Sequence, residues 1–197
     1  ISELERKARW LRRVALERAA SAGKGHLGGV YSCAELLVAL YYGGVLRVDP
    51  ARPRWPQRDR FFMGKGHACL GLYPILQELG FLDAARFDSY GRDGGLGGQM
   101  DITIPGVEYN TGSLGHVLGI AAGVALAAKL DGASFQAFAL LGDAECYEGA
   151  IWEALVFAGQ QGLERLVGII DRNRLSVTDV LDDEGFFKGL PDAVRGF

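Results

Sequence analysis

A strand–helix–strand pattern near the end of the chain limits the folds that this sequence can form. An apolar segment covers residues 136–141, a segment with a helical pattern covers about 146–161, and a second apolar segment covers 166–170. Two strands joined by a crossover helix pair in parallel. The pattern therefore predicts an α/β fold with a mostly parallel open sheet flanked by helices.

Polar residues follow both apolar segments, at the points where the expected strands end. Asp143 comes just after the first strand and Asn173 just after the second. Ligands of open α/β sheets bind outside the carboxyl ends of the strands, so both residues should face one crevice. Carboxylate, amide and backbone carbonyl oxygens suit Mg²⁺ or Ca²⁺, particularly when a diphosphate completes the shell. A structural interpretation stays open, in which Asp143 caps a helix and Asn173 occupies a turn.

The segment NTGSLGH, residues 110–116, has the features of an anion-binding helix start. Ser113 is the predicted N-cap of a helix that extends to about Leu130. Free N–H groups and the helix dipole favour an anionic group at such a start. Together with the oxygen ligands at the strand ends, this segment predicts a site for a metal-diphosphate cofactor.

The same predicted helix carries small residues at every fourth position: Gly115, Gly119, Gly123 and Ala127. One face of the helix is therefore bare and can lie very close to another element. Two interpretations fit this face, namely ordinary tight packing within the domain and contact with another chain.

Glycine accounts for 29 of the 197 residues and clusters at 23–29, 64–67 and 91–98. Because glycine allows close backbone approach and positive φ, such clusters are typical of tight turns or of loops around a ligand. The three histidines, His26, His67 and His116, all lie in glycine-containing motifs. We expect two of them to line the pocket.

The rest of the sequence predicts helices and loops that belong to one domain of ordinary size. Helices are predicted over 3–20, 33–42, about 67–79 and about 83–90, and a short strand over 61–63. A loop rich in proline and arginine covers 47–60, and residues 92–112 show neither helical nor strand periodicity. Irregular segments of that length inside a domain are usually functional or disordered.

Amino-acid composition limits the classes of partner that we expect and the cell compartment in which we expect the protein. The formal net charge of −3 does not indicate nucleic-acid binding, so a small molecule or a protein is the expected partner. Three cysteines without metal-ligand or CxxC spacing argue against a disulfide framework and predict a cytoplasmic location. The first twenty residues form a charged amphipathic pattern, unlike a signal peptide. The uncharged apolar run at 117–128 is too short to span a bilayer, so no membrane contact is expected.

Several blocks together resemble the transketolase family. GDAECYEGAIWEA followed by IIDRNRLS resembles the thiamine-diphosphate signature of that family. The family's other blocks occur in the same order, as GKGHLGG, DRFFMGKGHACLGLY and PGVEYNTGSLGHVLGIAAGVALAAK. The match covers nearly the whole chain, so residues 1–197 are expected to form one domain. It implies a thiamine-diphosphate-binding fold, equivalent to the N-terminal, diphosphate-binding domain of the family.

The resemblance also implies roles for individual residues. Mg²⁺ would be held by Asp143, Asn173 and the backbone carbonyl of Leu175. The residues expected to contact the cofactor are His67, Gly112, Ser113, Leu114, Gly142, Ala144, Glu145 and Asn173. The expected catalytic set is His26, His67, His116 and Glu148, with His26 in the substrate channel. Glu148 would join Glu153 in an acidic network that links cofactor sites across an interface. If both lie on one helix they are roughly 140° apart, so we expect at least one to point inward or into an interface.

The sequence departs from the family pattern in three respects. Ala144 stands where the signature usually has glycine, and its methyl group is tolerated if φ is negative. Gln99 stands where transketolases usually carry a histidine associated with the donor ketose, which puts the usual sugar phosphates in doubt. The pyrimidine-binding domain of the family does not occur in this sequence. We therefore expect that domain on a partner chain, a C-terminal transketolase-like subunit, in an α₂β₂ assembly.

The implied function is thiamine-diphosphate- and Mg²⁺-dependent transfer of a two-carbon ketol unit from a ketose, such as a ketose phosphate, to an acceptor. Two alternatives stay open: an E1-like component that passes an acyl unit to the lipoyl group of a carrier protein, and a non-catalytic partner subunit. A Rossmann dehydrogenase is disfavoured, because no GxGxxG motif follows a first strand.

Overall fold

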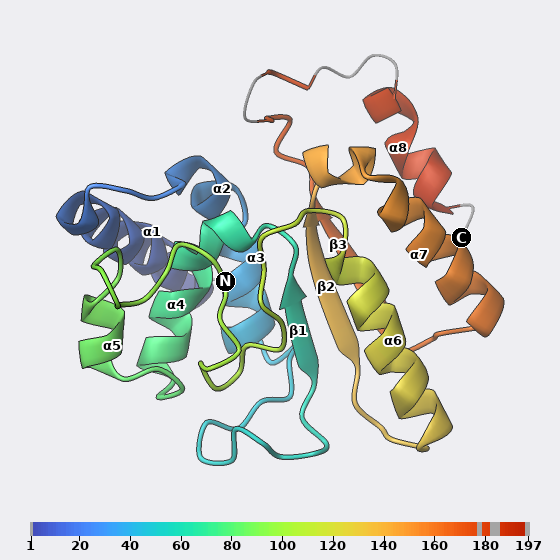
Figure 1. Cartoon of the computed structure of the whole chain (residues 1–197), viewed down its shortest axis with the longest axis horizontal. Coiled ribbons are helices and arrows are strands. Elements are labelled where there is room, and N and C mark those ends of the chain that lie inside the picture. The colour runs from blue at the N-terminus through green and yellow to red at the C-terminus, as the bar shows by residue number, and fades with distance from the viewer. Residues whose placement is uncertain (1, 177–178, 182–185, 196–197) are drawn as a thin grey trace. The chain divides into compact units, whose positions relative to one another are not determined.

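The structure is a computed structural model that describes residues 2–176, 179–181 and 186–195 (Figure 1). The chain forms two compact units. The first contains residues 1–61 and 65–112, and the second contains residues 62–64 and 113–197. Because each expected site residue belongs to one unit or the other, the units are described one at a time.

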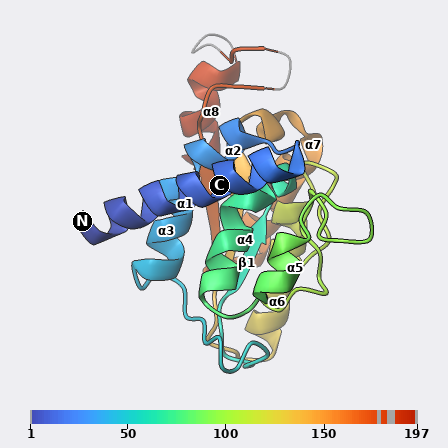
Figure 2. The same cartoon turned by 90° about the vertical axis from the view of Figure 1, so that its left-hand side faces the viewer.

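The first unit is a group of helices. Its elements are α1 (Ser2–Ala22), α2 (Leu27–Ser32), α3 (Ala34–Tyr42), η1 (Gly66–Ala68), α4 (Cys69–Glu78) and α5 (Ala84–Asp88). Helix α1 packs against α2, α3 and α4 (Figure 2). It buries Ala8, Leu11, Ala15 and Ala19, whose spacing places them on one face of a helix. These helices confirm the sequence predictions, except that the short helix α2 was read as part of a glycine loop.

Side-chain contacts anchor the two long loops of the first unit. Asp59, which is buried, accepts hydrogen bonds from the backbone and the guanidinium of Arg47 and so ties the ends of the loop at 47–60 together. Residues 92–112 contain no regular element beyond turns, as predicted. The Tyr73 hydroxyl donates to the carbonyl of Gln99, and the Thr111 hydroxyl accepts from the N–H of Met100 at 2.9 Å. These contacts hold the irregular segment in a defined path.

The second unit contains the predicted strand–helix–strand pattern. Its strands β1 (Arg60–Met63), β2 (Ala137–Gly142) and β3 (Leu166–Asp171) form an open sheet of order β1-β2-β3, and β1 begins in residues of the first unit. Strands β2 and β3 pair in parallel from Ala137↔Leu166 to Gly142↔Asp171. Because β2 and β3 end in register, whatever follows both strands lies at one edge of the sheet.

Helices of the second unit flank this sheet (Figure 1). They are α6 (Val117–Leu130), η2 (Ala144–Tyr147), α7 (Gly149–Gln161) and α8 (Phe186–Arg195). Helix α6 packs against β2, β3 and α7. The α/β architecture and the parallel pair confirm the fold predicted from the sequence. In the described part of the chain, no helix is both long and apolar enough to cross a membrane.

Two helix starts differ from the predictions. Helix α6 begins at Val117 with His116 as its N-cap, so the prediction of Ser113 as the cap is wrong. Gly115 adopts φ +86°, which is a left-handed backbone conformation. A right-handed helix cannot include such a residue, so α6 begins only after Gly115. Gly115 therefore does not belong to the small-residue face, which keeps Gly119, Gly123 and Ala127, all exposed. The segment predicted as one helix from about 146 is η2 followed by α7, with Glu148 between them.

Candidate functional site

The ends of β2 and β3 bring the two expected metal ligands into one region. Asp143 directly follows β2, and its N–H donates to the carbonyl of Asp171, the last residue of β3, at 3.2 Å. The N–H of Asn173 donates to the same carbonyl at 3.0 Å. Because one carbonyl accepts from both residues, Asp143 and Asn173 lie together at the carboxyl edge of the sheet, as the sequence predicted.

Asp143 is 1% exposed, and its carboxylate is oriented by the backbone. One oxygen accepts from the N–H of Ala144 at 2.9 Å and caps η2, and the other accepts from the N–H of Arg174 at 2.7 Å. Arg174 is the one described non-glycine residue with positive φ, at 61°. Such a conformation is strained for a side-chain-bearing residue and persists where its surroundings enforce it. The strained turn therefore aims an N–H at Asp143, a contact that no local pattern indicated.

Asn173 and Leu175 form the second part of the strand-end cluster. The amide oxygen of Asn173 accepts from the N–H of Leu175 at 2.9 Å, which is an Asx-type turn. Leu175 makes an isolated antiparallel bridge to Val180, and the N–H of Leu181 donates to the carbonyl of Arg174 at 2.8 Å. The structural roles of Asp143 and Asn173 as cap and turn residues are thus present. The same contacts also set the directions of the two side chains.

The oxygen atoms at the strand ends suit a hard cation when another group supplies the rest of its ligands. Each carboxylate and amide oxygen has two lone pairs, so an oxygen that accepts from one backbone N–H can also bind a cation. Among residues 2–176, 179–181 and 186–195, no group of three or more His, Cys, Asp and Glu side chains is placed to hold a metal ion. A cation here would rely on carboxylate, amide and carbonyl oxygens together with oxygens of a ligand such as a diphosphate.

The turn before α6 supplies the expected anion-binding segment. Ser113, Leu114 and His116 are exposed, whereas Gly115 is buried. The N–H of Gly115 donates to the Glu145 carboxylate at 2.9 Å, so this amide faces the protein. The other amides of the turn lie at the start of a helix of 14 residues, whose dipole favours an anion.

Ala144 and Glu148 resolve two expectations about the signature segment. Ala144 is not among the residues with positive φ, so its methyl group causes no backbone strain. Glu148 is the N-cap of α7, with extended φ −72° and ψ 124°. Helical spacing therefore does not relate it to Glu153, and both side chains are exposed. Neither side chain therefore points inward in the described chain, and a position of one or both in an interface stays a prediction.

In the first unit, the structure brings His26 and His67 together. Their ring centroids are 5.3 Å apart in an edge-on arrangement. His26 is exposed and precedes α2, whereas His67 is partly buried in η1. Lys65 is 3% exposed and donates to the carbonyl of Gly29 at 3.1 Å and to the Ser32 hydroxyl at 3.0 Å. Lys65 thereby ties the loop that carries His26 to the turn that carries His67. We did not predict this role, although the GKGH motif contains the lysine.

His67 has a pKa below its ordinary value, and the causes are burial first, then the charges of His26 and Lys65. We expect its ring to titrate with a midpoint below 6.5 in an NMR pH titration. The unfolded chain binds this proton at the ordinary pKa, so the contribution of His67 to the free energy of unfolding falls as pH drops below about 6.5. His26→Gln should move the midpoint upward only in part, because burial remains. A His116→Gln variant assigns the resonances, and a midpoint at or above 6.5 would contradict the expectation.

Gln99 also lies beside the GKGH turn. Its amide oxygen accepts from the Thr111 hydroxyl at 2.8 Å, which leaves the amide NH₂ as its donor group. A Cβ atom on Gly66 would overlap both the Thr111 side chain and this amide oxygen. The position therefore requires glycine. At Gly66, the turn that carries His67 therefore lies directly against the side chains of Gln99 and Thr111.

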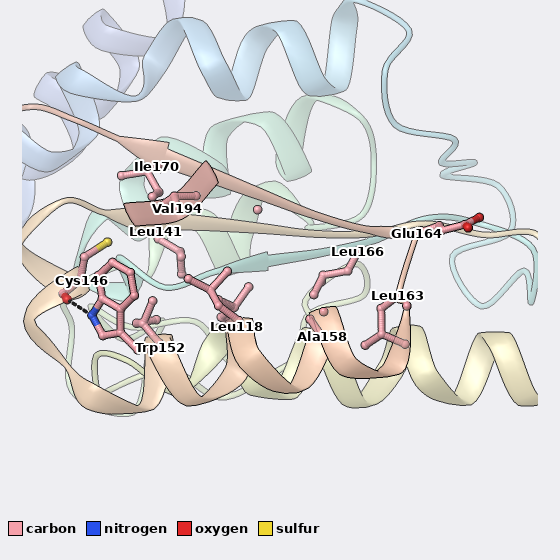
Figure 3. Close-up of a pocket in the computed structure, with 15 residues that line it drawn as sticks. Leu118, Leu141, Cys146, Trp152, Ala158, Leu163, Glu164, Leu166, Ile170 and Val194 are labelled. Atoms are coloured by element: carbon pink, nitrogen blue, oxygen red, sulfur yellow. Dashed lines mark hydrogen bonds between the residues drawn. The ribbon is translucent and has the colours of Figure 1, made fainter. Parts of the chain in front are cut away.

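A separate apolar cavity of about 350 Å³ lies between α7 and β3 (Figure 3). Its lining includes Leu118, Leu141, Trp152, Leu166 and Ile170, and the Trp152 ring is held by a hydrogen bond to the carbonyl of Cys146 at 2.9 Å. None of the residues expected to bind the cofactor or the metal lines this cavity. The candidate site is therefore the polar strand-end cluster, and the apolar cavity is distinct from it.

Comparison with known proteins agrees with the family resemblance found in the sequence. Residues 4–184 match the family described as transketolase, thiamine diphosphate binding domain. One subunit of an apulose-4-phosphate transketolase from Phocaeicola vulgatus is 39% identical over 198 residues, covering 100% of this chain and 70% of that protein. A 6-deoxy-6-sulfo-D-fructose transketolase subunit from a Clostridium species is 34% identical, covering 99% of this chain and 71% of its own length.

Solved structures agree with the sequence matches. Transketolase from Leishmania mexicana superposes with a TM-score of 0.88 at 29% identity, over 98% of this chain. The chain spans 30% of that enzyme, so it corresponds to one part of a full-length transketolase. The family match, the subunit relatives and the strand-end oxygens all point to one conclusion. This chain belongs to the transketolase family and is its thiamine-diphosphate-binding domain, similar to one of the subunits of split transketolases.

Proposed function

We propose that this chain is the diphosphate-binding subunit of a two-subunit transketolase that depends on thiamine diphosphate and Mg²⁺. It would transfer a two-carbon ketol unit from a ketose to an acceptor. The observation that carries the proposal is the pair Asp143 and Asn173, held at the ends of two parallel strands beside the start of α6. The names of the relatives favour ketol transfer over the E1-like and non-catalytic alternatives.

The proposed roles of the residues follow from their chemistry. Asp143, Asn173 and the carbonyl of Leu175 would hold Mg²⁺, and the turn 113–116 would face the diphosphate. Thiamine diphosphate supplies, when bound, a nucleophilic carbon and an electron sink for cleaving the bond between C2 and C3 of a ketose. His67 is kept neutral by burial near neutral pH, so it can donate one hydrogen bond and accept another. The assignments of His26, His116 and Glu148 to substrate binding and catalysis stay predictions.

A partner subunit is part of the proposal. Two relatives are named as subunits of a transketolase, which supports a second chain here. We propose that this second chain is a C-terminal transketolase-like subunit with the pyrimidine-binding domain, in an α₂β₂ complex. A cytoplasmic location also stays a prediction.

The experiment that tests the proposal is reconstitution with that second subunit. The complex would be incubated with ketose phosphates and with a sulfonated ketose, in the presence of Mg²⁺, thiamine diphosphate and aldose acceptors. Mass spectrometry should show an acceptor lengthened by two carbons and a donor shortened by two. If no pair of substrates exchanges a two-carbon unit in the presence of the cofactor, the proposed function is wrong.

Gln99 should determine how well ordinary ketose phosphates react. Its amide oxygen is engaged by Thr111, so the side chain offers a neutral NH₂ donor, whereas a protonated histidine would offer a charged one. A charge-assisted hydrogen bond contributes about 1.5–3 kcal/mol, so Gln99→His should raise kcat/KM on xylulose 5-phosphate or fructose 6-phosphate about ten- to a hundred-fold. The gain should be larger at pH 6 than at pH 8.5.

The matched control for this prediction is Gln160→His, which adds an exposed histidine on α7. It should leave kcat/KM unchanged for both sugars. If Gln99→His is no faster than wild type on either sugar between pH 6 and 8.5, Gln99 does not determine donor specificity.

A further inference from the structure

Glu145 is a carboxylate held inside the second unit, two residues beyond Asp143. The residue is 2% exposed, and it lies in the short helix η2. One carboxylate oxygen accepts from the N–H of Gly115 at 2.9 Å, and the other accepts from the N–H of Gly142 at 3.1 Å. A buried carboxylate is costly unless hydrogen bonds compensate its lost hydration, so these bonds are required for Glu145 to occupy this place.

The two amides belong to different segments of the proposed cofactor site. Gly115 lies in the turn 113–116 that precedes α6, which is the proposed diphosphate segment. Gly142 is the last residue of β2, and Asp143 follows it. Glu145 therefore connects the proposed anion-binding turn to the strand end that carries the proposed metal ligand. Hydrogen bonds to an ionised acceptor are stronger than neutral ones, which favours a fixed spacing between the two segments.

Gly64, which directly follows β1, lies against the carboxylate of Glu145. Its N–H donates to the carbonyl of Leu140 in β2 at 2.7 Å. A Cβ atom on Gly64 would overlap both carboxylate oxygens of Glu145. Its φ is not in the left-handed region, so space and not backbone conformation makes glycine necessary here. Three segments far apart in the sequence thus meet at one side chain.

We propose that Glu145 is a positioning residue, which sets the spacing between the diphosphate-binding turn and the metal-binding strand end through Gly115 and Gly142. It acts through these two amides, and this indirect role replaces the direct cofactor contact that the sequence led us to expect for Glu145. The inference rests on the proposed function, since the two segments are those assigned to thiamine diphosphate and Mg²⁺. Glutamine at this position keeps one oxygen acceptor and replaces the other with a donor, so one of the two amides loses its partner.

The test compares Glu145→Gln with wild type in the complex reconstituted with the partner subunit. Calorimetric titration with thiamine diphosphate at saturating Mg²⁺ should show binding weakened about ten-fold or more, because one charge-assisted hydrogen bond is lost. At saturating cofactor, kcat should return to near the wild-type value. Hydrogen–deuterium exchange of a peptide covering 110–118 should become faster, while a peptide from α1 stays unchanged. Glu164→Gln, an exposed glutamate exchanged in the same way, is the matched control.

A second variant displaces the same carboxylate through a neighbouring residue, Gly64. Gly64→Ala should push the Glu145 side chain away and produce the same weaker binding and faster exchange at 110–118. In the double variant Gly64→Ala with Glu145→Ala, the alanine at 64 should cause little further change, because the colliding carboxylate is gone.

Three results distinguish failure of the positioning role from failure of the proposed function. Wild-type cofactor affinity and exchange in Glu145→Gln would overturn the positioning role. A loss of kcat that persists at saturating cofactor would also overturn it, because it would indicate a direct part in the reaction. If wild type itself binds no thiamine diphosphate, the proposed function fails, while the exchange of 110–118 in the variants still decides whether Glu145 holds the turn.

Discussion

Asp143→Ala should abolish Mg²⁺-dependent binding of thiamine diphosphate to the reconstituted enzyme. The carboxylate of Asp143 is the one charged group among the three proposed metal ligands. It already has a fixed direction, because the N–H groups of Ala144 and Arg174 hold both oxygens. Removing a hydrogen-bond partner of a metal ligand weakens metal binding about 10- to 100-fold, and loss of the charged ligand itself should exceed that. Ketol transfer should therefore disappear at any practical cofactor concentration.

The structure adds a stability cost to this variant. Asp143 is buried, and alanine would leave the N–H groups of Ala144 and Arg174 without their acceptor. These two hydrogen bonds are partly buried, and a fully buried group left unsatisfied costs about 1–3 kcal/mol, so the melting temperature should fall although the chain still folds. Arg174→Gly is the matched control, since it keeps the N–H that contacts Asp143 and removes the Cβ atom from a residue with φ 61°.

Calorimetric titration with thiamine diphosphate, at fixed Mg²⁺ and then without it, measures the effect. Wild type and Arg174→Gly should bind the cofactor only with Mg²⁺, and Asp143→Ala should show no binding in either condition. An unchanged cofactor affinity in a folded Asp143→Ala enzyme would remove Asp143 from the metal site. Circular dichroism on the same samples establishes that each variant is folded.

The second large effect concerns assembly with the partner subunit, which we expect to involve the small-residue face of α6. Isolated, this chain should show no ketol transfer, and activity should appear on addition of the partner subunit. Gly123→Leu should weaken that assembly by roughly ten- to a hundred-fold, because a large side chain would intrude on a closely packed interface. In the isolated chain, a Cβ atom on Gly123 meets no heavy atom within 4 Å. Leucine also favours the helix over glycine, so the variant should be as stable as wild type or more so.

Gly189→Leu is the control for this substitution, because Gly189 is also a helical glycine whose Cβ would meet no atom of the described residues within 4 Å. Sedimentation of mixtures with the partner subunit gives the assembly affinity, and titration of activity against partner concentration gives an independent value. Equal affinities for Gly123→Leu and wild type would exclude this face of α6 from the interface. Full activity of the isolated chain would show that no second subunit is needed.

Much of the fold and part of the site could be predicted because they depend on local patterns. The period of apolar residues identifies β2, α7 and β3, and parallel pairing follows from the crossover connection. The positions of Asp143 and Asn173 after those strands then place them at one edge of the sheet. That argument needs only strand direction, and the common contact to the carbonyl of Asp171 agrees with it.

Features that depend on backbone conformation and on distant contacts were found only in the structure. The left-handed Gly115 moved the start of α6 beyond Ser113, and the extended backbone of Glu148 separated it from the helix that carries Glu153. The contact between His26 and His67, and the connection from Glu145 to Gly115, join residues 30 or more positions apart. The fold class, the family and the edge of the sheet that carries the site could be inferred from the sequence alone, because periodicity and motif order are local properties. Which amides and side chains meet there was decided by packing, because such contacts form only when separate segments are brought together.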